Sequence, residues 1–235
     1  MGARRIALTQ EAETAEAPSA KGPMPPHARL TDILSREELK DLLAWAIANA
    51  QNFDQATVYF HGDEGGSQVD LEQRTALRLR DLGPFRQIFQ KRLLDRLPEI
   101  MTSMGYRGTP PVSLEFELNA YGEGGHFRPH IDINTGPNRE AMGERLGEDR
   151  VISAVFYFYR EPKGFSGGAL RLFRFGADTA DPTPDDVISY EPEQNSLVVF
   201  PSWAWHQVED VHCPSGCFAD YRFALNCWFC RTIEA

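Results

Sequence analysis

The chain from residue 112 onward constrains the fold most, because short apolar runs alternate there with turn residues. The first run alternates apolar and polar residues, which is the pattern of a half-buried strand. Gly, Pro and Asp separate the runs VSLEFELNAY (112–121), RVISAVFYFY (150–159), GALRLFRF (168–175), SLVVF (196–200) and YRFALNCWF (221–229). Many short strands of this kind predict an antiparallel β-sandwich or barrel.

Two helices are predicted before the strand-rich region. In LSREELKDLLAWAIANA, Ser35 can cap a helix, Glu38 follows three residues later, and apolar residues recur at helical spacing. This pattern predicts a helix at about 36–50. A second helix is predicted from about 84 to 103, because a proline suits its first turn and apolar residues recur along it. Pro98 is expected to kink or end this second helix.

The other segments of the first half are predicted to be less regular. QATVYF (55–60) has the composition of a strand, and HGDEGGSQVD (61–70) that of a mobile loop. Residues 1–28 are rich in Ala, Glu and Pro and have few bulky apolar side chains, so we expect a disordered N-terminal tail. The expected fold class is mainly β (α+β), with helices buttressing one face of the strands.

Charge and hydropathy restrict the partners and the compartment. The 235 residues include 24 basic and 34 acidic side chains, and the net charge of −10 argues against nucleic acid or an anionic membrane as the main partner. The N-terminal region has no apolar run typical of a secretory signal, and no stretch of the sequence is long and apolar enough to span a membrane. We therefore expect a cytoplasmic protein that binds neither nucleic acid nor membrane.

Four cysteines lie late in the chain. The spacings of Cys213 with Cys217 and of Cys227 with Cys230 allow a zinc site. Cys227 and Cys230 fall on a predicted strand, however, and residues three apart on a strand face opposite sides. We expect ordinary reduced thiols, with structural zinc and a Cys213–Cys217 disulfide as the alternatives.

A candidate metal site begins in HFRPHID (126–132). His130 and Asp132 share a face if this segment is extended, because residues i and i+2 do so on a strand. Two histidines and one carboxylate form the facial triad of non-haem Fe(II) oxygenases, which leaves coordination positions open. His206 follows the predicted strand SLVVF, where a barrel would deliver it beside His130. Other histidines, in the tail, in the early loop or four residues before His130, fit less well: His27, His61 and His126.

Five segments, in order, resemble motifs of the Fe(II)- and 2-oxoglutarate-dependent dioxygenases of the prolyl 4-hydroxylase type. YGEGGHFRPHID is similar to the family's tyrosine, glycine and His-x-Asp run, and RVISAVFYFY to the strand after it. FSGGALRLF resembles its Gly-Gly turn, SLVVFPSWAWHQV its second-histidine strand, and YRFALNCWF its closing strand with a basic residue near the start. The resemblance covers about 112–230. It departs from the family in EDVHCPSGCFAD (209–220), an inserted loop that lengthens the spacing from His206 to Arg222.

The resemblance implies roles for individual residues. His130, Asp132 and His206 would be the iron ligands and catalytic residues. Arg222 would pair with the distal carboxylate of 2-oxoglutarate, which a planar guanidinium can bind in a bidentate manner. Arg150 would lie near a peptide substrate, or in solvent, and a Gly-Gly pair would form a tight turn at Gly167 and Gly168. Residues expected around the co-substrate, each of which also fits an ordinary core position, are Tyr121, Tyr157, Leu170, Val208 and Trp228.

The resemblance also implies the fold and the reaction. We expect a double-stranded β-helix (jelly-roll, cupin-like) core at 112–230 and a helical buttress at 30–105, within one dioxygenase domain at 29–235. The expected reaction is hydroxylation of an aliphatic C–H bond, in a prolyl or similar residue of a peptide or protein. It would require Fe(II), 2-oxoglutarate and O2, with ascorbate as a supporting reductant, and release succinate and CO2. The alternatives are a hydroxylase of a free amino acid or small natural product, and a non-redox cupin-like metal-binding protein.

Overall fold

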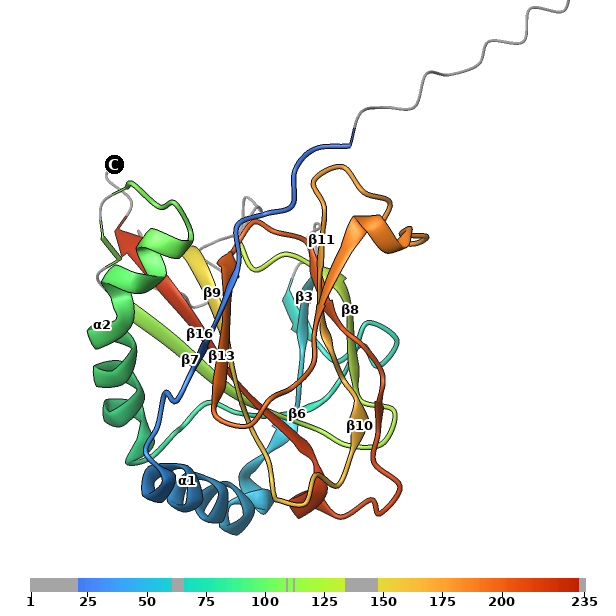
Figure 1. Cartoon of the computed structure of the whole chain (residues 1–235). Helices are drawn as coiled ribbons and strands as arrows, with labels where there is room; N and C mark the ends of the chain where they lie inside the picture. Colours follow the sequence, from blue (N-terminus) through green and yellow to red (C-terminus); the bar gives the residue numbers. More distant parts are fainter. Residues whose placement is uncertain (1–20, 61–65, 109, 112, 134–147, 233–235) are drawn as a thin grey trace, which may run out of the picture.

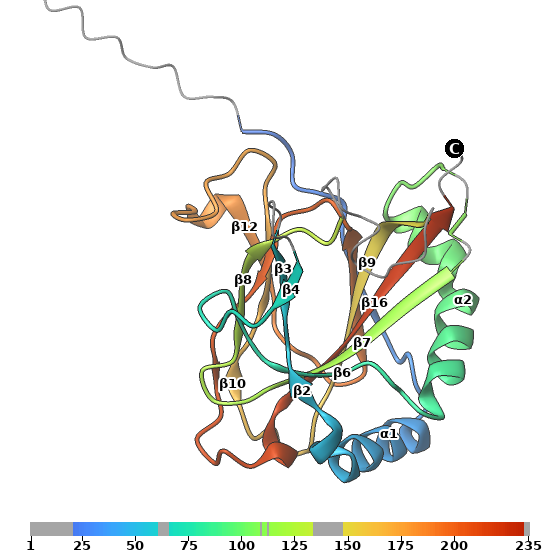
Figure 2. The same cartoon turned by 180° about the vertical axis from the view of Figure 1, so that it is seen from behind.

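The computed structural model describes residues 21–60, 66–108, 110–111, 113–133 and 148–232. Two antiparallel sheets face each other as a jelly roll, with the helices on the outside (Figures 1 and 2). The larger sheet has seven strands, in the order β1 (Ala28–Thr31), β13 (Ser196–Pro201), β9 (Glu148–Phe158), β16 (Arg222–Thr232), β7 (Ser113–Tyr121), β6 (Leu77–Leu79) and β2 (Asp54–Gln55). The second sheet has five, in the order β12 (Val187–Tyr190), β11 (Leu170–Phe173), β14 (His206–Val208), β8 (His126–His130) and β5 (Arg74–Thr75).

Short elements connect the two sheets. The antiparallel pairs are β3 (Val58–Phe60) with β4 (Gly66–Gln68), and β10 (Ser166–Gly167) with β15 (Val211–His212). Single 3-10 turns occur at Ala50–Asn52, Pro184–Asp186 and Phe218–Asp220. The strand predicted at 55–60 is therefore divided between β2 and β3. The predicted loop at 61–70 contains β4, whose backbone pairs with β3, and its residues 61–65 lie outside the described part of the chain.

Both predicted helices are confirmed, as α1 (Arg36–Ala48) and α2 (Phe85–Ser103). The Ser35 hydroxyl accepts a hydrogen bond from the Glu38 backbone N–H at 3.2 Å, and the Glu38 carboxylate accepts one from the Ser35 N–H at 2.8 Å. This capping box satisfies two donors that a helix start otherwise leaves unpaired. No helix in the described ranges is long and apolar enough to cross a membrane.

Of the two outcomes expected at Pro98, an end of the helix is wrong, because α2 continues through it to Ser103, and a kink stays a prediction. Proline removes one intrahelical hydrogen bond, which weakens a helix most when nothing else holds it. Here Phe89, Leu93 and Ile100 anchor the turns on both sides, since all three are fully buried against the larger sheet. Tertiary packing therefore outweighs the local preference.

Strand alternation divides the buried side chains between two layers. Along β9, Phe156 faces the helices, where its ring meets that of Phe89 at 5.1 Å. Tyr157 faces the second sheet instead and joins the cluster between the sheets. β7 was predicted to be half-buried, but every residue from Phe116 to Tyr121 is buried, because the helices cover one face and the second sheet covers the other. Inward-facing residues of β7, β9 and β16 thus line an enclosed interior.

Residues 21–28, the described part of the expected N-terminal tail, contact the rest of the chain. The Lys21 ammonium pairs with Asp186 at 2.5 Å, and the backbone N–H of Gly22 donates to the Phe175 carbonyl at 3.0 Å. β1 then pairs with the edge strand β13. Residues 21–28 are therefore held by backbone and ionic contacts, whereas residues 1–20 lie outside the described ranges. The division into tail and single domain stays a prediction.

The four cysteines are free thiols, and no bond joins Cys213 to Cys217. Cys213, Cys227 and Cys230 are buried, whereas Cys217 is exposed. Burial raises the pKa of the Cys227 thiol well above its usual value, which keeps the sulfur protonated and poorly nucleophilic.

Candidate active site

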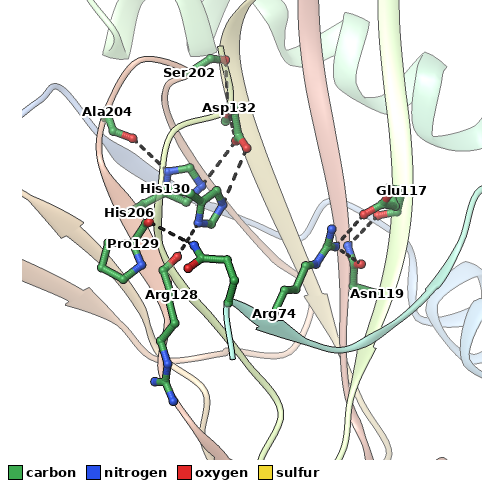
Figure 3. Close-up of polar contacts among 12 residues, drawn as sticks. Arg74, Glu117, Asn119, Arg128, Pro129, His130, Asp132, Ser202, Ala204 and His206 are labelled. Atoms are coloured by element: carbon green, nitrogen blue, oxygen red, sulfur yellow. Dashed lines mark hydrogen bonds and ion pairs between the residues drawn. The ribbon is translucent and has the colours of Figure 1, made fainter. Parts of the chain in front are cut away.

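The three predicted metal ligands lie together between the two sheets (Figure 3). His130 ends β8, His206 begins β14, and these two residues are direct partners in the sheet. Asp132 follows β8 by two residues. The ligand atoms of the three side chains all lie within 4.8 Å of one another. Asp132 Oδ2 is 3.5 Å from His206 Nε2, and Asp132 Oδ1 is 3.8 Å from His130 Nε2.

Backbone carbonyls orient both imidazoles. The Nδ1 of His130 lies 2.8 Å from the Arg128 carbonyl, and the Nδ1 of His206 lies 2.9 Å from the Ala204 carbonyl. A carbonyl can only accept, so each Nδ1 carries the proton and each Nε2 lone pair is available to a metal. Burial, together with the neighbouring His206, lowers the pKa of His130 well below its usual value, so this imidazole is neutral.

Two serines hold Asp132 in place. Its backbone N–H donates to the Ser202 carbonyl at 2.9 Å, and its Oδ2 accepts a hydrogen bond from the Ser153 hydroxyl at 2.6 Å. Burial favours the neutral acid, but His206 and the Ser153 hydrogen bond are among the groups that outweigh it, and the pKa of Asp132 falls to about 2. The carboxylate is therefore ionised. Neither serine was predicted, although Ser153 shares the inward face of β9 with Tyr157 and the alternation could have identified it.

One pocket contains the triad and extends along β16 to Arg222. Predicted residues that line it are Tyr121, His130, Asp132, Leu170, His206, Val208, Arg222 and Trp228. Lining residues that the sequence did not single out are Phe127, Ser153, Ala154, Val155, Ala224 and Asn226. Arg222, Ala224, Asn226 and Trp228 alternate along β16, so this strand forms one wall of the pocket.

The guanidinium of Arg222 is fully buried at one end of this pocket. Its Nε donates to the Gly168 carbonyl at 2.8 Å, and its Cζ lies 4.8 Å from the ring centre of Tyr121 and 5.0 Å from that of Tyr157. Within the described residues, neither Nη has a hydrogen-bond partner. A buried cation with unpaired donors is costly unless an anion joins it. This end of the pocket therefore suits a carboxylate.

Gly168 does more than form the predicted turn. Its φ is +70°, and a Cβ built on it would lie only 2.6 Å from Cδ of Arg222. Gly167 also has a positive φ, of 69°. Glycine is needed at 168 for two reasons. Its positive φ disfavours other residues, and the Arg222 side chain occupies the space that a Cβ would fill.

Two predicted residues lie beside the pocket and do not line it. Tyr157 contacts Arg222, and burial raises the pKa of its phenol to about 12, so it remains a hydrogen-bond donor. Arg150 donates from Nε and Nη2 to Glu115 Oε2 at 2.9 and 2.6 Å, and its guanidinium lies 3.9 Å from the ring centre of Trp228. Arg150 is therefore an ion-paired residue at the Trp228 end of the pocket, and the alternative of a solvated arginine is wrong.

A jelly roll whose interior holds two histidines and one carboxylate, beside open space, defines the class of facial-triad non-haem metalloenzymes. Residues 116–230 match the model of the 2OG-Fe(II) oxygenase superfamily. The chain thus carries a 2OG-Fe(II) oxygenase domain, and the protein is an oxidoreductase of the dioxygenase type. Members of this superfamily use Fe(II), 2-oxoglutarate and O2, which sets aside the alternative of a non-redox cupin-like protein.

Relatives and solved structures agree with this assignment. An uncharacterized PKHD-type hydroxylase of Synechocystis sp. is 28% identical over 231 residues, which cover 97% of this chain and 68% of the relative. A prolyl-4-hydroxylase of Pseudomonas putida superposes with a TM-score of 0.56 at 21% identity, covering 88% of this chain and 93% of the other. A prolyl hydroxylase of Trichoplax adhaerens, in complex with a hypoxia inducible factor peptide fragment, gives 0.55 at 17% identity, covering 87% and 83%. At these identities the two structures show a shared fold.

Proposed function

We propose that the protein binds Fe(II) through His130, Asp132 and His206, binds 2-oxoglutarate through Arg222, and hydroxylates an aliphatic C–H bond of a prolyl or similar residue in a polypeptide. One observation carries this proposal. A single pocket contains both a set of three converging metal-ligand side chains and a buried guanidinium whose two Nη groups have no described partner.

The donor set fits a divalent iron. Two imidazoles, of which that of His130 is neutral, and one ionised carboxylate give the ligand types of a facial triad. The Nδ1 hydrogen bonds and the Ser153 hydroxyl hold these ligands in position before the metal arrives. Because all three ligands come from one side, further positions remain for a co-substrate and O2.

The opposite end of the pocket fits the distal carboxylate of 2-oxoglutarate. The planar fork of Arg222 can donate two parallel hydrogen bonds to a carboxylate, while its Nε stays bonded to Gly168. Tyr121 and Tyr157 contribute phenol groups beside the guanidinium, and Leu170 and Val208 contribute apolar surface. In this arrangement the keto-acid end of 2-oxoglutarate points from Arg222 toward the metal ligands.

When bound, Fe(II) and 2-oxoglutarate supply an O2-derived oxidant that inserts one oxygen atom into a C–H bond, with succinate and CO2 as the co-products. The chain's own residues orient the reactants and exclude water. Asp132 stays ionised, the imidazole of His130 stays neutral, and the apolar walls formed by Leu170, Val208 and Trp228 limit solvent access.

Support for a polypeptide substrate comes from the relatives and from the Trp228 end of the pocket. The two solved structures compared above are named as prolyl hydroxylases, and one of them is in complex with a peptide fragment. Trp228 lies six positions beyond Arg222 on the same face of β16, so it is on the far side of the pocket from the co-substrate anchor. A flat indole suits a pyrrolidine ring.

Turnover of 2-oxoglutarate tests the reaction and the substrate separately. The purified protein is supplied with Fe(II), ascorbate and 2-oxoglutarate, with and without proline-containing peptides, and both succinate and the mass of the peptides are measured. We expect succinate formation and a mass gain of one oxygen atom that depends on 2-oxoglutarate. The surface variant Lys91→Met, far from the pocket on α2, is the control.

Two outcomes contradict parts of the proposal. Absence of succinate under every condition would refute the assigned iron and 2-oxoglutarate residues. A mass gain confined to free amino acids or small natural products would keep those residues and move the substrate to the alternative class.

A further inference from the structure

A second buried arginine lies beside the triad and has no part in the proposed reaction. Arg74 in β5 is only 5% exposed. Its Nη2 donates to Glu117 Oε1 at 2.7 Å and to Asn119 Oδ1 at 2.6 Å, and its Nη1 donates to the Thr57 carbonyl at 3.2 Å (Figure 3). Glu117 and Asn119 belong to the larger sheet, whereas Arg74 belongs to the edge of the second sheet. Arg74 therefore ties the two sheets together across the interior.

This buried pair is ionised on both sides. Burial alone would favour the neutral form of each group, but the charges of Arg74 and Glu117 stabilise each other. The pKa of Arg74 is consequently raised and that of Glu117 lowered. The guanidinium is thus held in one place by a carboxylate, an amide oxygen and a backbone carbonyl.

The same guanidinium contacts the ring that supports His130. Its Cζ lies 4.7 Å from the ring centre of Phe127, and the imidazole of His130 stacks on Phe127 with 3.4 Å between centres and 15° between planes. Phe127 therefore contacts both the guanidinium of Arg74 and the imidazole of His130, and Arg74 is in turn held by Glu117 and Asn119 of the larger sheet.

The backbone strengthens this connection. Arg74 and Phe127 are direct partners in the pairing of β5 with β8. One residue earlier, the Gln73 carbonyl accepts a hydrogen bond from the Arg128 N–H at 2.8 Å, and the Gln73 amide donates to the Pro129 carbonyl at 3.4 Å. The segment that leads to His130 is thus fixed along its length by β5.

We propose that Arg74 is a positioning residue for the metal site, which holds Phe127 against His130 and so fixes the plane of the imidazole with its Nε2 directed at the metal position. This inference rests on the proposed role of His130 as a ligand. Without the guanidinium, Phe127 can tilt away, and the imidazole then keeps its Nδ1 hydrogen bond to Arg128 and its contact with the His206 ring but loses its stacked support. Metal binding must then also order the His130 imidazole, and this cost lowers the affinity for the metal.

The test compares two double variants that differ only in the arginine removed. Arg74→Met/Glu117→Gln removes the proposed support without leaving a buried carboxylate unpaired, which would endanger folding. Arg78→Met/Glu117→Gln is the matched control, because Arg78 contacts the same carboxylate at 3.8 Å. Co(II) is titrated into each metal-free protein, its visible absorption spectrum is recorded, and 2-oxoglutarate affinity is measured at saturating Co(II).

We expect the Arg74 double variant to bind Co(II) about tenfold more weakly, the typical effect of losing support for a ligand, with altered absorption bands. The Arg78 double variant should match the wild type in Co(II) affinity and in its absorption bands. The affinity for 2-oxoglutarate should change little in either, since Arg222 is untouched. Phe127→Leu should reproduce the loss, and adding it to the Arg74 double variant should cause little further loss, because both act through one contact.

Wild-type Co(II) affinity and spectrum in the Arg74 double variant would overturn the inference and leave the proposed function intact. Equal losses in both double variants would also overturn it, because the effect would then belong to Glu117. If the wild-type protein itself fails to bind Co(II), the role of His130 as a ligand fails, and the inference fails with it.

Discussion

Replacing Arg222 with methionine should weaken co-substrate binding and leave the stability of the ligand-free protein nearly unchanged. The substitution keeps a long side chain but loses the hydrogen bond from the charged guanidinium to Gly168, which is worth about 1.5–3 kcal/mol. It also loses the attraction to two tyrosine rings, about 1–2 kcal/mol together. Against this, it relieves the burial of two unpaired Nη groups, which costs about 1–3 kcal/mol for each group. These losses and gains nearly cancel, so we expect the ligand-free variant to match the stability of the wild type within about 1 kcal/mol.

The affinity for 2-oxoglutarate should fall strongly. Losing one partner of a buried charged hydrogen-bonded pair costs about 2–5 kcal/mol, so the affinity should fall at least about thirtyfold. Urea unfolding in the presence of Zn(II), a redox-inert metal, measures both effects. With 2-oxoglutarate at about 100 times its wild-type Kd, the wild type gains about 2.7 kcal/mol in unfolding free energy. The variant should gain less than about 1 kcal/mol.

Two results would refute this reasoning. One is a ligand-free Arg222→Met protein that is clearly less stable than the wild type, which would mean that the guanidinium is not unpaired. The other is an equal gain in stability from 2-oxoglutarate in both proteins, which would place the anchor elsewhere. Arg92→Met is the control, because this arginine pairs with Glu38 at the surface and should leave the 2-oxoglutarate effect unchanged.

Three further substitutions test other parts of the structure. Gly168→Ala places a methyl group 2.6 Å from Cδ of the anchor arginine, and isothermal titration should show 2-oxoglutarate affinity reduced about tenfold or more. Ser153→Ala removes the hydrogen bond to Asp132 and should weaken Co(II) binding about tenfold, measured by titration of the metal-free protein. Asp186 has a pKa of about 2, below its usual 3.8, because the hydrogen bonds from Lys21 and its neighbours favour the carboxylate. The stability that these bonds supply is present above about pH 4 and is lost as the pH falls toward 2, so urea curves of wild type and Asp186→Asn should differ at neutral pH and converge near about pH 2.

Each of these three predictions has its own contradiction. Unchanged 2-oxoglutarate affinity in Gly168→Ala would mean that Arg222 has room to move. Wild-type Co(II) affinity in Ser153→Ala would show that the carboxylate needs no support. If the unfolding free energies of the wild type and Asp186→Asn still differ by the same amount near about pH 2, the stabilisation does not come from the ionised carboxylate of Asp186.

The sequence predicted the parts of the site that depend on local geometry and strand order. His130 and Asp132 are two residues apart on an extended segment, and His206 follows a strand that pairs beside them, so few other arrangements bring the three together. Arg222 was expected from the resemblance of YRFALNCWF to the closing strand of the dioxygenase family. In the structure, alternation along β16 turns Arg222 inward with Trp228.

The sequence could not predict which part of the protein packs against each face of a strand. The polar residues of VSLEFELNAY indicated a solvated side of a half-buried strand, yet Glu117 and Asn119 face the interior and bind Arg74, more than forty residues earlier in the chain. Alternation says which residues share a face, but only packing decides whether water, a helix or another sheet meets it. The stack of Arg74 on Phe127 arises in the same way, from contacts between strands distant in sequence. Pro98 shows the converse, where packing overrode a correct local rule.

The position of β16 in the larger sheet has a consequence for how this enzyme is made. β16 is inserted between β7 and β9, both of which come earlier in the chain, and it carries Arg222 at its first residue. The two earlier strands must therefore wait, unpaired with each other, until residues 222–232 have left the ribosome, and such long-range pairing is slow. A nascent chain that already contains His130, Asp132 and His206 still lacks the central strand of its sheet. The same strand completes the sheet and carries Arg222, the proposed anchor for 2-oxoglutarate. An incompletely folded chain therefore has the metal ligands but cannot bind the co-substrate that would make the metal reactive.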